Sequence, residues 1–329
     1  MTLPVRSLTA LVALSVVACT IRAPVLPEIM PQVTEAIELS DTPFFAQERY
    51  QCGPAALATV LKAAGVLVAH SDLVDQVYLP TEHGSLQVKL LAATRRAERI
   101  PYVIEPTLNG IHAELDAGRP VLVLQNLGLS FLPVWHYAVV VGIDPAGDSV
   151  ILRSGTERRK NSRVTDSLRS WQMASNWGMV SLTPGEMPTS TTPRRLITAV
   201  AQAEPMLSVP SRKRAYRAAL DRWPESITAR FGYAHALNAA GEFKAAEDNY
   251  RAIVNQYPRH AAALNNLAEV VANRGCYTQA TEIASRALAI ATEDQPALIG
   301  TISETLHGFP ISRDDEDRCT QIEGASRGS

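Results

Sequence analysis

The 329 residues of the chain exceed what one average domain needs, and with 46% hydrophobic and 19% charged residues it has the composition of an ordinary globular protein. With a formal net charge of −2, the chain lacks the excess of positive charge that binds a polyanion, so we expect no nucleic-acid partner. The sequence contains neither a Cys-x-x-Cys pair nor a His-Glu-x-x-His motif, so we expect no metal site and no cofactor.

Residues 1–18 indicate a secretory signal. Arg6 supplies one positive charge, and the apolar run after it is too short to span a membrane. The sequence Val16-Val-Ala-Cys19 resembles the bacterial lipoprotein box, which implies lipid attachment at Cys19 and removal of everything before it. Thr20 then implies, by the same resemblance, the periplasmic side of the outer membrane. The alternative is a plain secretory signal with an incidental cysteine.

The stretch from Gln47 to Gly65 predicts a loop followed by an amphipathic helix that begins at Cys52. Apolar residues keep helical spacing after Cys52, Pro54 is tolerated in a first turn, and Gly65 follows the last apolar position. The unpaired N–H groups and the dipole of a helix N-terminus stabilise a thiolate. Cys52 is therefore a candidate nucleophile and the Gln47 amide a candidate oxyanion donor. The alternative is a buried cysteine at a loop–helix junction.

A β-rich run, Pro133-Val-Trp-His-Tyr-Ala-Val-Val-Val-Gly-Ile, carries His136 near its start. A cysteine at a helix start and a histidine on a distant strand form the arrangement that thiol catalysis uses, because the two meet only in the fold. A single histidine on a strand is more often a hydrogen-bonded polar residue. Together with Cys52-Gly-Pro-Ala, His136 is the better candidate for a catalytic base.

These motifs, Gln47…Cys52-Gly-Pro-Ala and His136-Tyr-Ala-Val-Val-Val-Gly, resemble the papain-like cysteine peptidases related to those that process double-glycine leader peptides. The resemblance covers roughly residues 40–183. It implies Cys52 as nucleophile, His136 as general base and acid, Gln47 as oxyanion donor, and a peptide or protein as substrate. Gln47 stands one residue closer to its cysteine than is usual, so Gln51 remains an alternative.

The third catalytic member departs from the family pattern. Members usually carry an aspartate at the end of the strand after the histidine strand, where it fixes the imidazole. Here Asp144 begins a hairpin turn, and at 3.3 Å per residue it lies on the order of 25 Å from His136, which excludes it. The residue that returns opposite His136 is near Ser154, which we take as a tentative orienter of the imidazole.

Between the two motifs, helical patterns cover residues 68–78, 85–97 and 111–117, and short strands cover 101–104 and 120–126. Helices followed by strands around His136 favour a papain-like α+β layout with the site at their junction. Trp135, Trp171 and Trp177 are candidates to line a substrate cleft, although aromatic residues more often belong to a core.

Beyond a Pro- and Thr-rich segment the chain repeats with a period of 34 residues, which is the tetratricopeptide period. Five positions of one repeat are matched 34 residues later. The pairs are Ala234 with Ala268, Leu237 with Val271, Gly241 with Gly275, Ala246 with Ala280, and Tyr250 with Ala284. We expect two repeats and a third, degenerate one over about 194–226. Such an all-α module either binds an envelope protein partner or caps and orients the first domain.

The predicted divisions are, in order, signal peptide 1–18, tether 19–40, papain-like domain 41–183, linker 184–193, tetratricopeptide-repeat module 194–308 and disordered tail 309–329. Cys276 and Cys319 are able to pair in an oxidising periplasm.

The sequence therefore predicts an envelope-anchored cysteine peptidase that touches the membrane through its lipid anchor only. One alternative is a catalytically degenerate lipoprotein that holds peptides and recruits a partner through its repeats. Another is a transpeptidase that uses the same residues with an amine as acceptor.

Overall fold

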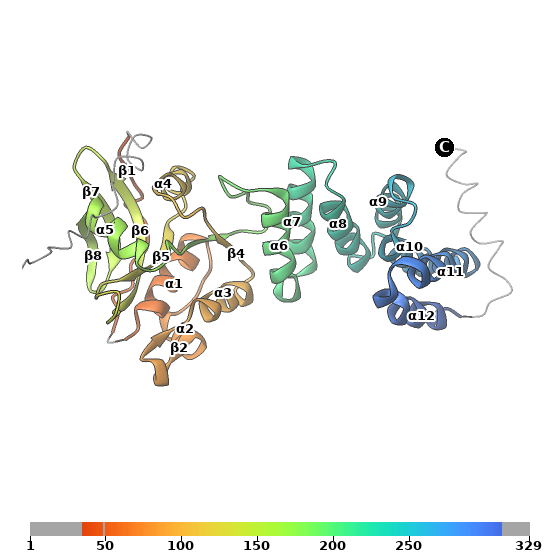
Figure 1. Ribbon diagram of the computed structural model, residues 1–329, viewed down its shortest axis with the longest axis horizontal. Helices are drawn as coiled ribbons and strands as arrows, with labels where there is room; N and C mark the ends of the chain where they lie inside the picture. The colour runs from red at the N-terminus through yellow and green to blue at the C-terminus, as the bar shows by residue number, and fades with distance from the viewer. Residues whose placement is uncertain (1–34, 49, 311–329) are drawn as a thin grey trace, which may run out of the picture.

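The computed structural model describes residues 35–48 and 50–310, and it consists of a mixed α/β domain followed by a row of helices (Figure 1). The predicted signal peptide, the lipidation site Cys19, most of the tether and nearly all of the predicted tail lie outside the described residues. Among the helices of the described ranges, none combines the length and the apolar character that a membrane crossing needs.

An antiparallel sheet forms the centre of the first domain, with strand order β4-β9-β5-β6-β7-β8 and β1 paired to the end of β6. Its strands are β1 (Ile37–Glu38), β4 (Ile100–Val103), β5 (Val121–Asn126), β6 (Trp135–Asp144), β7 (Ser149–Ser154), β8 (Glu157–Arg163) and β9 (Gly178–Leu182). A second, two-stranded sheet pairs β2 (Tyr78–Leu79) with β3 (Gly84–Ser85).

Helices cover both faces of the large sheet, because successive side chains of its central strands point to opposite sides. Tyr137 and Val139 of β6 pack in one core with α1 (Cys52–Ala63), α2 (His70–Val77) and α3 (Gln87–Arg96). Ala138 and Val140 pack in a second core with α4 (Leu108–Asp116) and α5 (Val164–Gln172). The central strands are thus buried on both faces, and the beginning of β6, paired with the end of β5, lies at one end of the sheet.

The three predicted helices between the motifs are present as α2, α3 and α4, and the two predicted strands as β4 and β5. One boundary is wrong. Gly84 and Ser85 do not begin a helix, because they pair with Tyr78 and Leu79 in the small sheet and are extended. The helix therefore starts at Gln87.

The segment 184–193 is held against the first domain by hydrogen bonds. The Glu114 carboxylate accepts from the backbone N–H and the hydroxyl of Thr189, at 2.9 and 2.7 Å. The Tyr102 hydroxyl donates to the carbonyl oxygen of Ser190 at 3.1 Å. Directly after this segment, Leu196 and Val200 of the next helix join the core that lies under α4 and α5. The first of the C-terminal helices is therefore packed onto the α/β domain.

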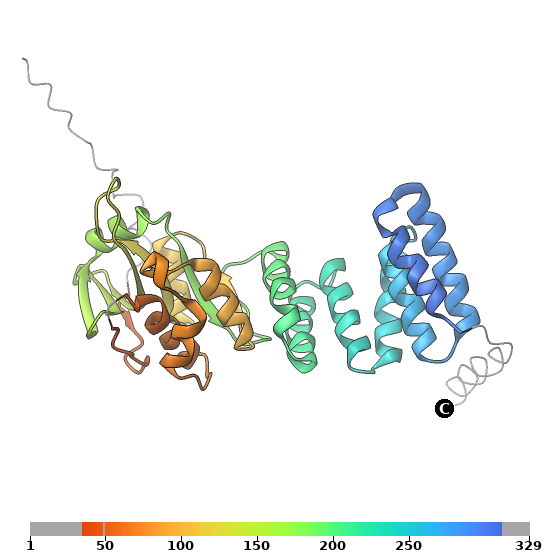
Figure 2. The same ribbon diagram turned by 90° about the horizontal axis from the view of Figure 1, so that it is seen from below.

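The C-terminal half consists of helices that pack as successive pairs (Figure 2). They are α6 (Pro193–Ala203), α7 (Val209–Arg222), α8 (Ile227–Ala239), α9 (Phe243–Gln256), α10 (Ala261–Asn273), α11 (Tyr277–Asp294) and α12 (Ile299–Gly308). Gly241 and Gly275 follow α8 and α10 with positive φ angles of 75° and 85°, which favour glycine. These pairs agree with a 34-residue repeat, and the tetratricopeptide assignment stays a prediction.

The cysteines divide into two chemical states. Cys52 carries a free thiol, whereas Cys276 is disulfide-bonded. Cys319, which the sequence offers as a candidate partner of Cys276, lies outside the described residues.

Candidate active site

Cys52 is the first residue of α1, and its thiol lies against the strand that carries His136. The Sγ atom is within hydrogen-bonding reach of the backbone N–H groups of Tyr137 and Gly53. Gly53 is buried, and a Cβ atom there would lie 2.4 Å from the Oγ of Ser85. Glycine after the cysteine thus lets the helix approach β3 closely enough to place the thiol beside Tyr137.

The Cys52 thiol is neutral at rest. Burial raises the pKa of the Cys52 thiol, and this effect outweighs the backbone N–H groups that lower it. The helix N-terminus alone predicts a thiolate at Cys52, and this prediction is wrong for the resting state. Desolvation of a buried thiol is the stronger effect here, and the thiol needs a base when it reacts.

His136 stands near the start of β6 and is hydrogen-bonded to Ser154 at the end of β7. Its Nε2 lies 2.8 Å from the Ser154 Oγ. Because Val139 pairs with Arg153, Ser154 lies diagonally from His136 on β7 and not directly opposite it. Asp144 stands at the other end of β6, opposite Ser149, and its carboxylate accepts a hydrogen bond from the backbone N–H of Gly147. Among the described residues, no carboxylate is hydrogen-bonded to the His136 ring.

Burial and the Lys160 ammonium lower the pKa of His136 to about 4. Burial and the positive charge of Lys160 both disfavour the imidazolium form of His136. A serine hydroxyl does not offset these two effects as an aspartate carboxylate would. His136 is therefore a neutral imidazole at neutral pH and is free to accept a proton.

The cysteine and the histidine are brought to the same end of the sheet, although no hydrogen bond joins the Cys52 thiol to the His136 ring among the described residues. Since Nε2 faces Ser154, the nitrogen left for the thiol is Nδ1. Catalytic hydrogen bonds are often long in ligand-free sites and tighten with substrate. The arrangement provides a neutral thiol and a neutral base on adjoining elements.

A small crevice of about 10 Å³, roughly the room of one water molecule, opens beside the thiol. It is lined by Phe45, Gln47, Cys52, Ala55, Ala56, Thr59, Tyr137, Arg153, Ser154 and Gly155. The backbone N–H of Gln47 donates to the carbonyl of Gly155 at 3.1 Å, which ties this loop to the turn after Ser154. Gln51 does not line the crevice, and its Nε2 donates to Glu48 at 3.3 Å. Of the two glutamines, Gln47 is the one beside the thiol.

Arg153 is a further residue of the site, and the sequence reasoning missed it. Its side chain is only 4% exposed, and its guanidinium donates to the carbonyl oxygens of Ser40, Thr42 and Arg158. These bonds hold the segment that leads to Gln47 against β7 and β8. The signal in the sequence was the cationic Arg153, which directly follows the apolar run Val150-Ile-Leu of a predicted strand.

The three tryptophans have different environments. Trp135 is 53% exposed beside His136. Trp171 is buried in the core and donates its Nε1–H to the carbonyl oxygen of Trp177, so the suggestion that it lines a cleft is wrong. Trp177 is partly buried, and its ring packs edge-to-face on Tyr137.

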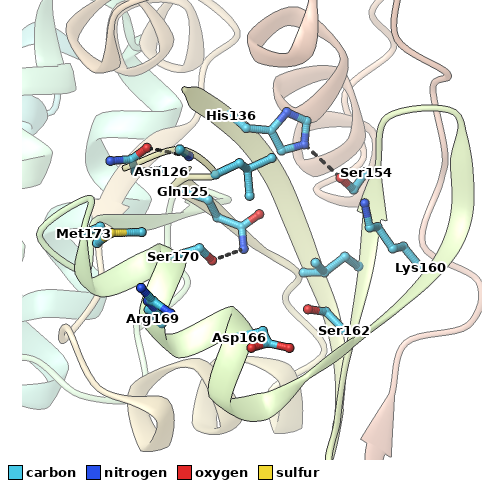
Figure 3. A pocket seen from close by; sticks show the side chains of 13 residues that line it. Gln125, Asn126, His136, Ser154, Lys160, Ser162, Asp166, Arg169, Ser170 and Met173 are labelled. Carbon is cyan, nitrogen blue, oxygen red and sulfur yellow. Dashed lines mark hydrogen bonds between the residues drawn. The ribbon is translucent and has the colours of Figure 1, made fainter. Parts of the chain in front are cut away.

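A larger hollow of about 440 Å³ also borders Ser154 (Figure 3). It is lined by Gln125, Asn126, Leu127, Gly128, His136, Leu152, Ser154, Lys160, Ser162, Asp166, Arg169, Ser170 and Met173. Ser154 borders both this hollow and the crevice of Cys52. In the part of the chain that the structure describes, no group of three His, Cys, Asp or Glu side chains is placed to hold a metal ion.

Comparison with known proteins finds similarity over the α/β domain. Residues 39–179 match the model of the Peptidase_C39 like family. Among solved structures, one similar chain is described as a C39-like peptidase from Bacillus anthracis, with 16% identity and a TM-score of 0.39 over 45% of this chain and 98% of that one. Another is a double glycine motif protease from an AMS/PCAT transporter in complex with the leader peptide, with 19% identity and a TM-score of 0.33 over 43% and 91%. Comparison with curated proteins gives no match.

Proposed function

We propose that the protein is a cysteine peptidase that hydrolyses peptide bonds with Cys52 as nucleophile and His136 as general base and acid. The observation that carries the proposal is the Cys52 thiol beside the N–H of Tyr137, the residue that follows His136. The family match over residues 39–179 supports the same reaction class.

The chemistry begins from neutral partners. His136 takes the proton of Cys52 through Nδ1 as Sγ attacks the carbonyl carbon of the peptide bond. The Gln47 amide, beside the thiol in the crevice, is assigned to the oxyanion. The imidazolium then gives its proton to the departing amine as the C–N bond breaks. Water, deprotonated by His136, attacks the thioester and releases a carboxylic acid and the free thiol.

The cellular setting belongs to the same proposal. Lipidation at Cys19 would hold the enzyme on the periplasmic side of the outer membrane, and the helix pairs from α6 onwards would serve as a tetratricopeptide module for a substrate or an envelope partner. Palmitate labelling of the wild-type protein and of a Cys19→Ser variant in a Gram-negative host tests the anchor.

A second candidate function, a peptide-holding protein without catalysis, is favoured by one observation. The hydrogen-bond partner of the His136 ring is Ser154 in place of a carboxylate, and the pKa of His136 is lowered to about 4. A transpeptidase would use the same residues, with an amine in place of water.

Cleavage of a peptide library by the wild-type protein and by Cys52→Ala and His136→Ala variants tests the proposal. We expect new peptide N-termini with the wild-type protein only. Full cleavage by Cys52→Ala would overturn the assignment. Peptide binding without cleavage by every form would favour the holding protein, and products with an added amine would identify a transpeptidase.

A further inference from the structure

The hollow in Figure 3 adjoins the proposed catalytic pair without containing the thiol. Its walls come from β5 to β8 and from α5, and the His136 ring and the Ser154 hydroxyl form part of them. At about 440 Å³ it has room for part of a peptide. A group bound there would lie beside Ser154, which also borders the crevice of Cys52.

Two elements place a positively charged side chain in the wall of this hollow. Lys160 lines it from β8, and its recorded ion pair is with the exposed carboxylate of Glu157, 3.6 Å away. Arg169 lines it from α5 and makes no ion pair among the described residues. Asp166, also on α5, is exposed at its rim. The half-buried Lys160 is the cation that influences His136.

Several polar groups of the hollow already have partners. The Gln125 amide donates to the Ser170 hydroxyl at 3.0 Å, and that hydroxyl donates to the carbonyl oxygen of Ser167 at 2.9 Å. The Lys160 ammonium remains to receive an anion near His136, because its ion pair among the described residues is with the exposed Glu157. Ser162 lines the hollow farther along β8, opposite Val150. An ammonium is a donor that a carboxylate accepts from.

Building on the peptidase function proposed above, we propose that this hollow binds a carboxylate of the substrate, which Lys160 holds beside Ser154 and His136. The bound carboxylate supplies the negative charge that the described residues do not place next to the imidazole. It forms and breaks no covalent bond. The substrate class is therefore a peptide with a carboxylate close to the scissile bond.

The effect of this carboxylate on His136 is electrostatic. The charged groups that line the hollow with His136 are Lys160 from β8 and Asp166 and Arg169 from α5, and Cys52 lies on α1, which packs against β6. Asp166 and Arg169 are exposed, so water screens them. A guest carboxylate would neutralise Lys160 and stabilise the imidazolium that forms when His136 takes the thiol proton.

An NMR titration of the His136 ring in the full chain with Cys52→Ala tests the binding without catalysis. We expect N-acetylglycine to raise the pKa of His136 from about 4 by about one unit, and N-acetylglycinamide to leave it unchanged. Lys160→Gln should abolish the shift, whereas Lys89→Gln, an exposed cation on α3, should retain it. No shift with N-acetylglycine, equal shifts with both probes, or a shift that survives Lys160→Gln would overturn the proposal.

Cleavage kinetics identify the source of the carboxylate. Peptides that end in a free carboxylate are compared with their amides, and peptides with Glu near the cleavage point with the same peptides carrying Gln. We expect kcat/KM to fall about tenfold or more when the relevant carboxylate is removed, and this difference to vanish in Lys160→Gln. If cleavage depends on Cys52 but responds neither to removal of the substrate carboxylate nor to Lys160→Gln, the proposed carboxylate site is wrong and the peptidase function stands. If no peptide is cleaved, the peptidase function fails, and the NMR titration alone decides whether the hollow binds a carboxylate.

Discussion

The Nε2 of His136 and the Oγ of Ser154 face each other at 2.8 Å across the end of the β6–β7 hairpin. This hydrogen bond orients the imidazole and leaves Nδ1 for the Cys52 thiol. A hydroxyl, however, does not compensate the positive charge that the ring acquires in catalysis. The site thus combines a buried thiol whose pKa is raised with a weakly basic histidine.

Replacing Ser154 with Asp should strengthen this base. A carboxylate beside Nε2 stabilises the imidazolium, so we expect the pKa of His136 to rise from about 4 by about one to three units and kcat/KM to increase about tenfold. NMR titration of the ring and peptide cleavage measure the two effects. Ser154→Ala is the matched control, and a folded Ser154→Asp protein with an unchanged His136 pKa would contradict this account.

The resting thiol should react slowly with alkylating agents at neutral pH. Because burial raises the pKa of Cys52, the rate of iodoacetamide labelling should rise only above the ordinary cysteine value of about 8.5. Mass spectrometry of the Cys52 peptide across pH measures the midpoint. A midpoint well below 8.5 that shifts upward in His136→Ala would instead reveal a thiolate–imidazolium pair.

Replacing Gly53 with Ala should damage both stability and activity. The added Cβ would lie 2.4 Å from the Oγ and 2.6 Å from the Cβ of Ser85, so α1 or β3 must move. We expect a loss of about 1–3 kcal/mol in the free energy of unfolding, measured in urea, and a fall in peptide cleavage. The double variant Gly53→Ala/Ser85→Gly removes the clash and should recover much of both. Absence of any recovery would show that this contact is not the cause.

The lowered pKa of His136 should make stability fall on acidification. An unfolded histidine titrates near 6.5, whereas folded His136 titrates near 4, so the unfolded state binds more protons between these values. The free energy of unfolding therefore decreases as pH falls from about 6.5 towards 4. Urea unfolding at pH 7 and pH 4.5 should show a larger loss for the wild-type protein than for His136→Gln. Equal losses of unfolding free energy in the two proteins would contradict this prediction and would mean that His136 is more solvated than the structure shows.

Replacing Gly232 with Ala should destabilise the helical half. A Cβ atom at this position of α8 would lie 2.3 Å from the ring of Tyr216 on α7, which is buried and donates its hydroxyl to Glu204. We expect a loss of about 1–3 kcal/mol in thermal or urea unfolding. Gly300→Ala on α12, where a Cβ meets nothing within 4 Å, is the control and should be neutral or slightly stabilising. The same loss in both variants would show that the contact with Tyr216 is not the cause.

The parts of the fold that the sequence predicts are those with strong periodicity. The apolar spacing after Cys52 predicts α1, and the β-rich run at His136 together with the turn at Asp144 predicts the hairpin that brings Ser154 within hydrogen-bonding distance of His136. The strand β8 has the sequence Glu-Arg-Arg-Lys-Asn-Ser-Arg, which shows no apolar alternation, and only its pairing with β7 makes it a strand.

The electrostatics of the site follow from burial, which a sequence does not display. A helix N-terminus favours a thiolate, yet desolvation of Cys52 is the larger effect in the folded protein. Lys160 is one charged residue among several in β8, and only the fold brings it near His136. Arg153 becomes recognisable as a support of the Gln47 loop once its carbonyl partners are known.

Mass spectrometry of the protein quenched in acid during peptide cleavage tests the central assignment most directly. The account predicts a thioester adduct whose added mass equals the acyl part of the peptide, located on Cys52 and absent from His136→Ala. Cleavage that proceeds at full rate in Cys52→Ala, or an acyl adduct on another residue, would contradict it.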